Sequence, residues 1–106
     1  MKYQKKHKWI IPILSVLIKA NKRDKKLSVS EIRAKLNNFE LYDDISFTQQ
    51  EARIWKILEW LSEHKKLSDI KSTESFFGSS DEFSEIFNEE TANLRVIRFG
   101  KLWGLE

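Results

Sequence analysis

The stretch SFTQQEARIWKILEWLSEH, residues 46–64, has the pattern of one long amphipathic helix. Its aliphatic residues recur at spacings of three, one and three, which places them on one stripe of a helix with about 3.6 residues per turn. Such a stripe must be buried against a hydrophobic core. A capping box, in which Thr48 caps the first turn and Glu51 reaches back to the cap, predicts the start of the helix. The stripe consists of Ile54, Ile57, Leu58 and Leu61.

The opposite face of this helix is small, polar and basic, and we interpret it as a face for a binding partner. It carries Gln49, Ala52, Arg53 and Lys56. A plain solvated surface would carry the same residues, with Lys56 paired to a nearby acidic residue in the next turn.

The composition indicates one globular domain spanning residues 1–106. With 41% hydrophobic and 33% charged residues, the chain can bury a single modest core. The absence of cysteine excludes disulfides and thiolate metal sites, and two histidines are too few for a zinc site, so we expect no cofactor. The absence of cysteine is also compatible with a reducing compartment, and we expect a cytoplasmic protein. The longest apolar run, residues 9–18, is too short to span a bilayer, so we expect no membrane association.

Charge is distributed unevenly along the chain. Residues 1–35 contain 11 Lys and Arg against two acidic residues, whereas residues 67–90 contain one Lys against seven acidic residues. A basic half of this kind suits a polyanion, because contacts to phosphates supply most of the sequence-independent affinity for nucleic acid. A lysine-rich solvated surface explains the same count.

Two further helices are expected before the long one. In the first, Pro12 is expected in the first turn, where its missing N–H has no partner, and the helix is expected to stop near Ala20 or Asn21. A capping box of Ser28 and Glu31 opens a short second helix that runs to about Asn37. The buried stripe of the first helix is expected to be Ile10, Ile13, Leu14, Leu17 and Ile18.

The pattern changes after residue 66. Residues 67–72 and 94–99 are expected to form strands, the second because LRVIRF alternates apolar and basic residues, and Leu102 with Trp103 is expected to add a last short strand. Between them, residues 73–93 are acidic and aromatic, and Ser80 can cap a fourth helix there. Trp9, Trp55, Trp60 and Trp103 are interpreted as packing or boundary residues, and the closing dipeptide Leu105-Glu106 as a cloning remnant on a fragment of a longer protein.

The order of elements resembles a winged helix-turn-helix domain. ILSVLIKA, LSVSEIRAKL and TQQEARIWKILEWLSEHKKL correspond to its three helices, followed by two strands. More narrowly, residues 12–67 resemble the amino-terminal winged-helix module of Mrr-type restriction endonucleases, through PILSVL, the SVSEI segment and the pair Arg53 and Trp55. The resemblance implies an α+β fold with a three-helix core and a small antiparallel β-sheet. The chain departs from the family in its long acidic insertion between the strands and in lacking the nuclease core.

The resemblance further implies a double-stranded DNA-binding module that inserts its third helix into the major groove. The module would target a restriction or defence nuclease, joined to a nuclease domain or subunit, or act as a small transcriptional regulator. Third-helix residues would read bases or meet a phosphate, residues around the second helix would position the backbone, and two arginines would come from the strand. The third-helix residues are Thr48, Gln49, Gln50, Arg53 and Lys56. The residues around the second helix are Ser28, Ser30, Arg33 and Lys35, and the strand arginines are Arg95 and Arg98.

Two other classes of function are weighed beside DNA binding. The same fold also serves protein–protein interaction, and residues 73–93, with Phe76 and Phe77, would then be the docking surface. An enzyme is not expected, because the chain has no Ser/His/Asp set, Gly-rich phosphate loop or metal cluster.

Overall fold

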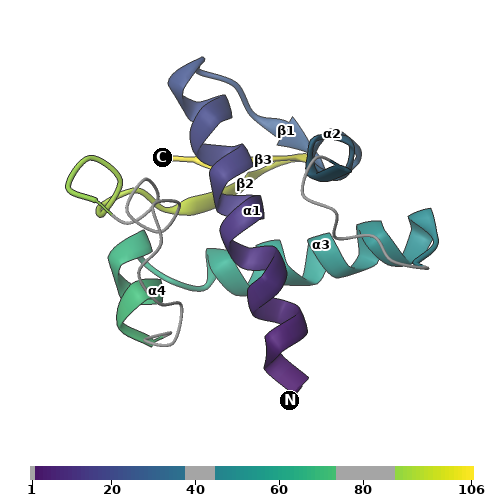
Figure 1. Ribbon diagram of the computed structural model, residues 1–106. Coiled ribbons are helices and arrows are strands. Elements are labelled where there is room, and N and C mark those ends of the chain that lie inside the picture. Colours follow the sequence, from purple (N-terminus) through teal and green to yellow (C-terminus); the bar gives the residue numbers. More distant parts are fainter. Residues whose placement is uncertain (1, 38–44, 74–87) are drawn as a thin grey trace.

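A computed structural model describes residues 2–37, 45–73 and 88–106 of the chain. In this part the fold is mixed α+β, with four helices and an open three-stranded antiparallel sheet (Figure 1). The elements are, in order, α1 (Lys2–Lys22), β1 (Leu27–Ser28), α2 (Val29–Leu36), α3 (Phe47–Ser62), α4 (Leu67–Thr73), β2 (Val96–Phe99) and β3 (Leu102–Leu105). None of the helices in the described residues is long and apolar enough to cross a membrane.

The sheet has the strand order β1-β3-β2. Leu27 pairs with Trp103 at one edge, and Phe99 pairs with Leu102 at the turn of the β2–β3 hairpin. The hairpin loop is therefore Gly100-Lys101, and Gly100 adopts a φ of 63°, which glycine reaches without a Cβ penalty. The expected last strand at Leu102 and Trp103 is thus confirmed.

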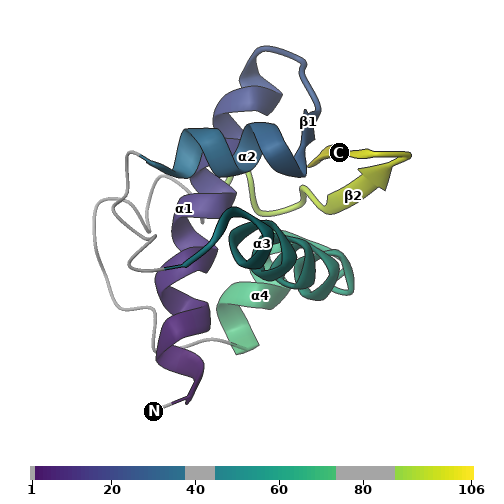
Figure 2. The same cartoon turned by 90° about the vertical axis from the view of Figure 1, so that its right-hand side faces the viewer.

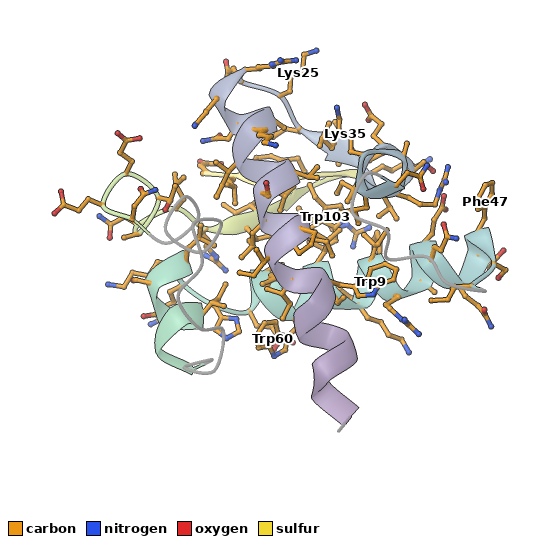
Figure 3. All side chains as sticks on the ribbon, viewed as in Figure 1. Trp9, Lys25, Lys35, Phe47, Trp60 and Trp103 are labelled. Carbon is orange, nitrogen blue, oxygen red and sulfur yellow. The ribbon has the colours of Figure 1, made fainter. Side chains whose placement is uncertain are left out.

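The core lies where α1 crosses α3 and the sheet. Every residue of the two stripes expected from the sequence is buried, four on α3 and five on α1. Trp9 and Trp103 are buried too, as expected, and the Trp103 ring meets the Trp55 ring edge-on with centroids 5.3 Å apart. Figure 3 shows Trp103 beneath α1 and Trp9 beside α3. Helix periodicity therefore identified the buried faces correctly.

Helix α1 begins at Lys2, so the expectation that Pro12 stands in its first turn is wrong. A proline inside a helix costs about 3 kcal/mol. Trp9 and Ile10, upstream of Pro12, are nevertheless fully buried, and burying each such side chain returns about 1.5–3 kcal/mol. Continuing the helix through the proline keeps both residues on the buried stripe.

Residues 67–72 form helix α4, so the strand expected there is wrong. The spacing gives the reason, because Leu67 and Ile70 are both buried and stand three residues apart. The start of α4 is held by backbone bonds, in which the N–H of Leu67 donates to Leu94 and that of Ser68 donates to Ala92. The helix expected from Ser80 onward lies outside the described residues.

Four smaller differences concern the strands, the capping and the end of the chain. The predicted strand 94–99 begins only at Val96, and β1 was not predicted at all because two residues show no periodicity. The cap of α3 is Ser46, which exchanges hydrogen bonds with Gln49, and not Thr48 with Glu51 as expected. Leu105, interpreted above as part of a cloning remnant, is buried in β3.

The second capping box is confirmed at α2. The N–H of Glu31 donates to the Ser28 hydroxyl at 3.2 Å, and the N–H of Ser28 donates to the Glu31 carboxylate at 3.0 Å. The hydrogen bond from the Ser28 N–H to the carboxylate, followed by the effect of the Ser28 hydroxyl, holds the pKa of Glu31 below its ordinary value of 4.5, and the charges of Lys35 and Lys25 add to the effect.

One further contact joins the chain between α1 and β1 to the sheet. The Lys26 side chain lies across Gly104 of β3, at a place where a Cβ on residue 104 would collide with it. Its ammonium donates to the Leu105 carbonyl at 3.4 Å and stands 4.9 Å from the centre of the Phe99 ring.

We predict that Ser28→Ala lowers the free energy of unfolding by about 1 kcal/mol, because one N–H of the first turn of α2 loses its acceptor. Urea denaturation followed by circular dichroism measures the change. Ser62→Ala is the matched control, because that hydroxyl only donates back to the Glu59 carbonyl within α3, and its effect should stay within about 0.5 kcal/mol. Equal losses in both variants would contradict the capping role.

We also predict how the contribution of Glu31 depends on pH. Since its pKa is lower in the folded than in the unfolded chain, its charge stabilises the fold above the unfolded pKa, and this stability is lost as the pH falls through the folded pKa. Glu31→Gln should therefore cost about 0.3 kcal/mol at pH 7, small because the carboxylate faces solvent, and less at pH 3. Urea titrations at both pH values measure the difference in unfolding free energy between the variant and the unaltered protein. An equal difference at the two pH values would contradict the prediction.

Candidate nucleic-acid interface

A hollow of about 350 Å³ opens between the start of α2, the outer face of α3 and the β2–β3 hairpin. We call it the α2–α3–hairpin groove. Figure 2 looks nearly along α3 and shows the hairpin projecting on one side of α2 and α3, with α1 on the other. The groove is lined by Ser28, Val29, Ser30, Glu51, Ala52, Trp55, Arg98 and Lys101.

Arg98 is held at the edge of the groove by two contacts. Its guanidinium stands 4.7 Å from the centre of the Trp55 ring, and its Nε donates to the Gly100 carbonyl at 2.8 Å. The Trp55 ring is in turn packed against buried Trp103. A positive charge of fixed position therefore stands beside the outer face of α3.

Lys101 is a lining residue that sequence reasoning missed. It occupies the tip of the hairpin and is exposed. A single lysine in a loop has no periodic signal, and only the neighbouring Gly100 marked a turn. Together with Arg98 it makes the hairpin side of the groove basic.

The outer strip of α3 continues from the groove. We use this name for Thr48, Ala52 and Lys56, which are four residues apart, lie on one side of the helix and are exposed. Gln49, at the side of the strip, is exposed, and its Oε1 accepts from the N–H of Ser46 in the cap. The small side chain of Ala52 leaves the middle of the strip open to a close approach.

Gln50 was expected on the reading face, but the structure buries it to 4% exposure. It stands one helical turn before Ile54 and so shares the core-facing side of α3. Its Nε2 donates to the Ile45 carbonyl at 2.7 Å, which fixes the chain that enters the helix. The residue therefore holds α3 in place and does not reach a ligand from this position.

Arg33 was expected to position a DNA backbone and instead links α2 to α3. Its Nε donates to Glu51 Oε2 at 3.1 Å, and the Ser30 hydroxyl donates to the same oxygen at 3.1 Å. The Arg33 guanidinium also covers the ring of Phe47, 4.2 Å from its centre. Phe47, in the first turn of α3, is nevertheless 67% exposed and was not singled out from the sequence (Figure 3).

Arg53 lies on the α1 side of α3. Its guanidinium stands 5.3 Å from the centre of the buried Trp9 ring, and the side chain is half-buried. The expectation that it points freely outward is therefore not met, because the upstream extension of α1 places an aromatic ring beside it.

The remaining expected residues lie apart from the groove. Lys35 is on the other side of α2, and Arg95 is at the far end of β2, where its Nη2 donates to the Ser62 carbonyl at 3.5 Å. The structure thus brings together Ser28, Ser30 and Arg98 in the groove, with Thr48, Gln49 and Lys56 beside it. Arg33 adjoins the groove through its bond to the lining residue Glu51, whereas Lys35, Gln50, Arg53 and Arg95 lie away from it.

Comparison of the chain with protein-family models, with curated proteins and with solved structures found no match.

Proposed function

We propose that the chain is a winged helix-turn-helix domain that binds double-stranded DNA through the α2–α3–hairpin groove and the outer strip of α3. In support, α1, α2, α3 and the short α4 precede the β2–β3 hairpin, and that hairpin stands beside α3 as a wing would. Helix α2 is short, capped and packed against α3, as in the helix-turn-helix pair.

The observation that carries the proposal is the convergence of three separate elements on one groove. The start of α2 contributes Ser30, whose hydroxyl donates to Glu51, α3 contributes its exposed outer strip, and the hairpin contributes Arg98 and Lys101. Protein–DNA interfaces combine a helix in the major groove with cations and hydroxyls on the flanking phosphates. In this chain the exposed strip of α3 and the two hairpin cations lie on one side of the molecule.

In the proposed complex α3 enters the major groove with its amino-terminal half. Thr48 and the free amide NH₂ of Gln49 face the base edges, and Lys56, farther along, meets a phosphate. Arg98 and Lys101 meet the phosphates of the neighbouring strand, which gives the sequence-independent part of the affinity. The domain would serve as the targeting module of a restriction or defence nuclease or as a small transcriptional regulator.

The test removes two exposed cations whose side chains make no hydrogen bond, ion pair or aromatic contact within the described residues. We predict that the double variant Lys56→Ala/Lys101→Ala binds a duplex oligonucleotide about tenfold more weakly and shows a salt dependence reduced by about two phosphate contacts. Fluorescence anisotropy at two or more salt concentrations measures both quantities. Arg53→Ala is unsuitable for this purpose, because it also removes the packing on Trp9.

The matched control is Lys65→Ala/Lys66→Ala, which removes the same charge from exposed positions after the end of α3. It should keep nearly the full affinity and salt dependence of the unaltered protein. Absence of duplex binding by the unaltered protein would refute the proposed function. Equal losses in the two double variants would refute the placement of DNA on this side.

A further inference from the structure

A second hollow, of about 290 Å³, lies on the other side of α2. It opens between the carboxyl-terminal half of α1, the turn that follows it and α2, and we call it the α1–α2 pocket. Helix α2 separates the two hollows, because Ser28 to Ser30 line the groove whereas Glu31 and Lys35 line the pocket. The lining of the α1–α2 pocket consists of Val16, Lys19, Ala20, Arg23, Lys25, Leu27, Glu31 and Lys35.

The pocket carries a concentrated positive charge. Four cations and one carboxylate line it, a net charge of +3. The carboxylate, on Glu31, accepts the hydrogen bond of the Ser28 N–H in the α2 cap and forms no ion pair within the described residues. Cations gathered around a concave surface raise its potential and attract anions.

The cations of the pocket differ from four others that the structure describes. Arg33 is paired with Glu51, Arg98 and Arg53 cover tryptophan rings, and Lys26 lies across the sheet. In the described part of the chain, no ion pair or aromatic contact involves any of the four cations of the pocket. They are Lys19, Arg23, Lys25 and Lys35.

The dipole of α1 explains only part of this cluster. Lys19, in the last turn of α1, complements the negative end of the helix, as does Lys22, which does not line the pocket. Lys25 lies beyond the helix and Lys35 comes from α2, so neither is placed by that dipole. Figure 3 shows these two side chains at the same edge of the molecule, although ten residues separate them in sequence.

We propose that the α1–α2 pocket binds a phosphate group, held by Lys19 of α1, by Arg23 and Lys25 of the turn that follows it, and by Lys35 of α2. Ammonium groups that approach from two elements suit a compact, doubly charged anion with several acceptor oxygens better than a planar carboxylate. The apolar floor, of Val16, Ala20 and Leu27, excludes water from one side and strengthens the attraction. This site is separate from the proposed DNA groove, and the phosphate belongs either to a free phosphate compound or to a nucleic acid.

The first experiment uses inorganic pyrophosphate as the probe at constant ionic strength. In ¹H–¹⁵N NMR spectra of the whole chain, we expect saturable shifts of the backbone amides of Lys25 and Lys35, while those of Ser30 and Lys101 stay in place. A response that fails to saturate, or that spreads evenly over all lysines, would overturn the proposal.

Two variants change the affinity in opposite directions. Lys25→Gln/Lys35→Gln should weaken pyrophosphate binding at least about tenfold, because it removes two of the net three charges. Glu31→Gln should strengthen it about threefold, because the negative charge is lost while glutamine still serves the capping box. Lys65→Gln/Lys66→Gln is the charge-matched control and should leave the affinity unchanged. A control that weakens binding equally, or Glu31→Gln without a gain, would overturn the proposal.

A second titration identifies the source of the phosphate and keeps the two proposals distinguishable. If duplex DNA shifts Lys25 and Lys35 together with Lys101, and pyrophosphate reverses only the first two, the pocket takes a nucleic-acid phosphate. If DNA shifts Lys101 alone, the pocket takes a free phosphate compound. Failure of DNA to bind at all refutes the proposed function and leaves the pyrophosphate titration to decide the pocket.

Discussion

The fold depends on the contact between two aliphatic stripes, one on α1 and one on α3. Each stripe contributes four or five fully or nearly fully buried side chains, and Trp103 of the last strand closes the same core. At about 1.5–3 kcal/mol for each large side chain, this burial outweighs the backbone bond that Pro12 removes from α1. The crossing of α1 and α3 in turn decides which residues of α3 remain outside, and therefore where a partner can meet the chain.

The junction between α2 and α3 combines the buried side chains of Ile32 and Leu36 with the hydrogen bonds of one carboxylate. Glu51 accepts from both Arg33 and Ser30, so a residue on the outer side of α3 fixes the neighbouring helix. The bond uses a cation that could otherwise meet a phosphate, while the pairing of Ser28 with Leu102 places the start of α2 beside the hairpin. The groove is thus bounded by a polar contact at the α2–α3 junction and by strand pairing at the hairpin.

Local patterns in the sequence predicted the features that depend on local physics. The buried stripes follow from helical periodicity, the α2 cap from the spacing of Ser28 and Glu31, and the last strand from its apolar residues after Gly100. The errors arose where distant contacts decide. Helix α1 continues through Pro12 because Trp9, upstream of it, is buried. At α3 the sequence offers two overlapping capping boxes, and the structure forms the one at Ser46. Arg33 and Arg53 contact residues from other parts of the chain, which the local pattern does not show. Lys101 is recognised as a lining residue of the groove only from the position of the hairpin in the structure.

Gly104 lets a lysine stem cross the face of the final strand. Lys26 reaches over it to the Leu105 carbonyl and the Phe99 ring, so the turn between α1 and β1 is fastened to the sheet at its middle. Arg23 and Lys25 belong to that turn, and Arg98 and Lys101 belong to the hairpin at the other end of the same strands. The turn and the hairpin, which carry the two basic surfaces, are thus joined through the Lys26 side chain, and a side chain at position 104 would displace the Lys26 stem from β3.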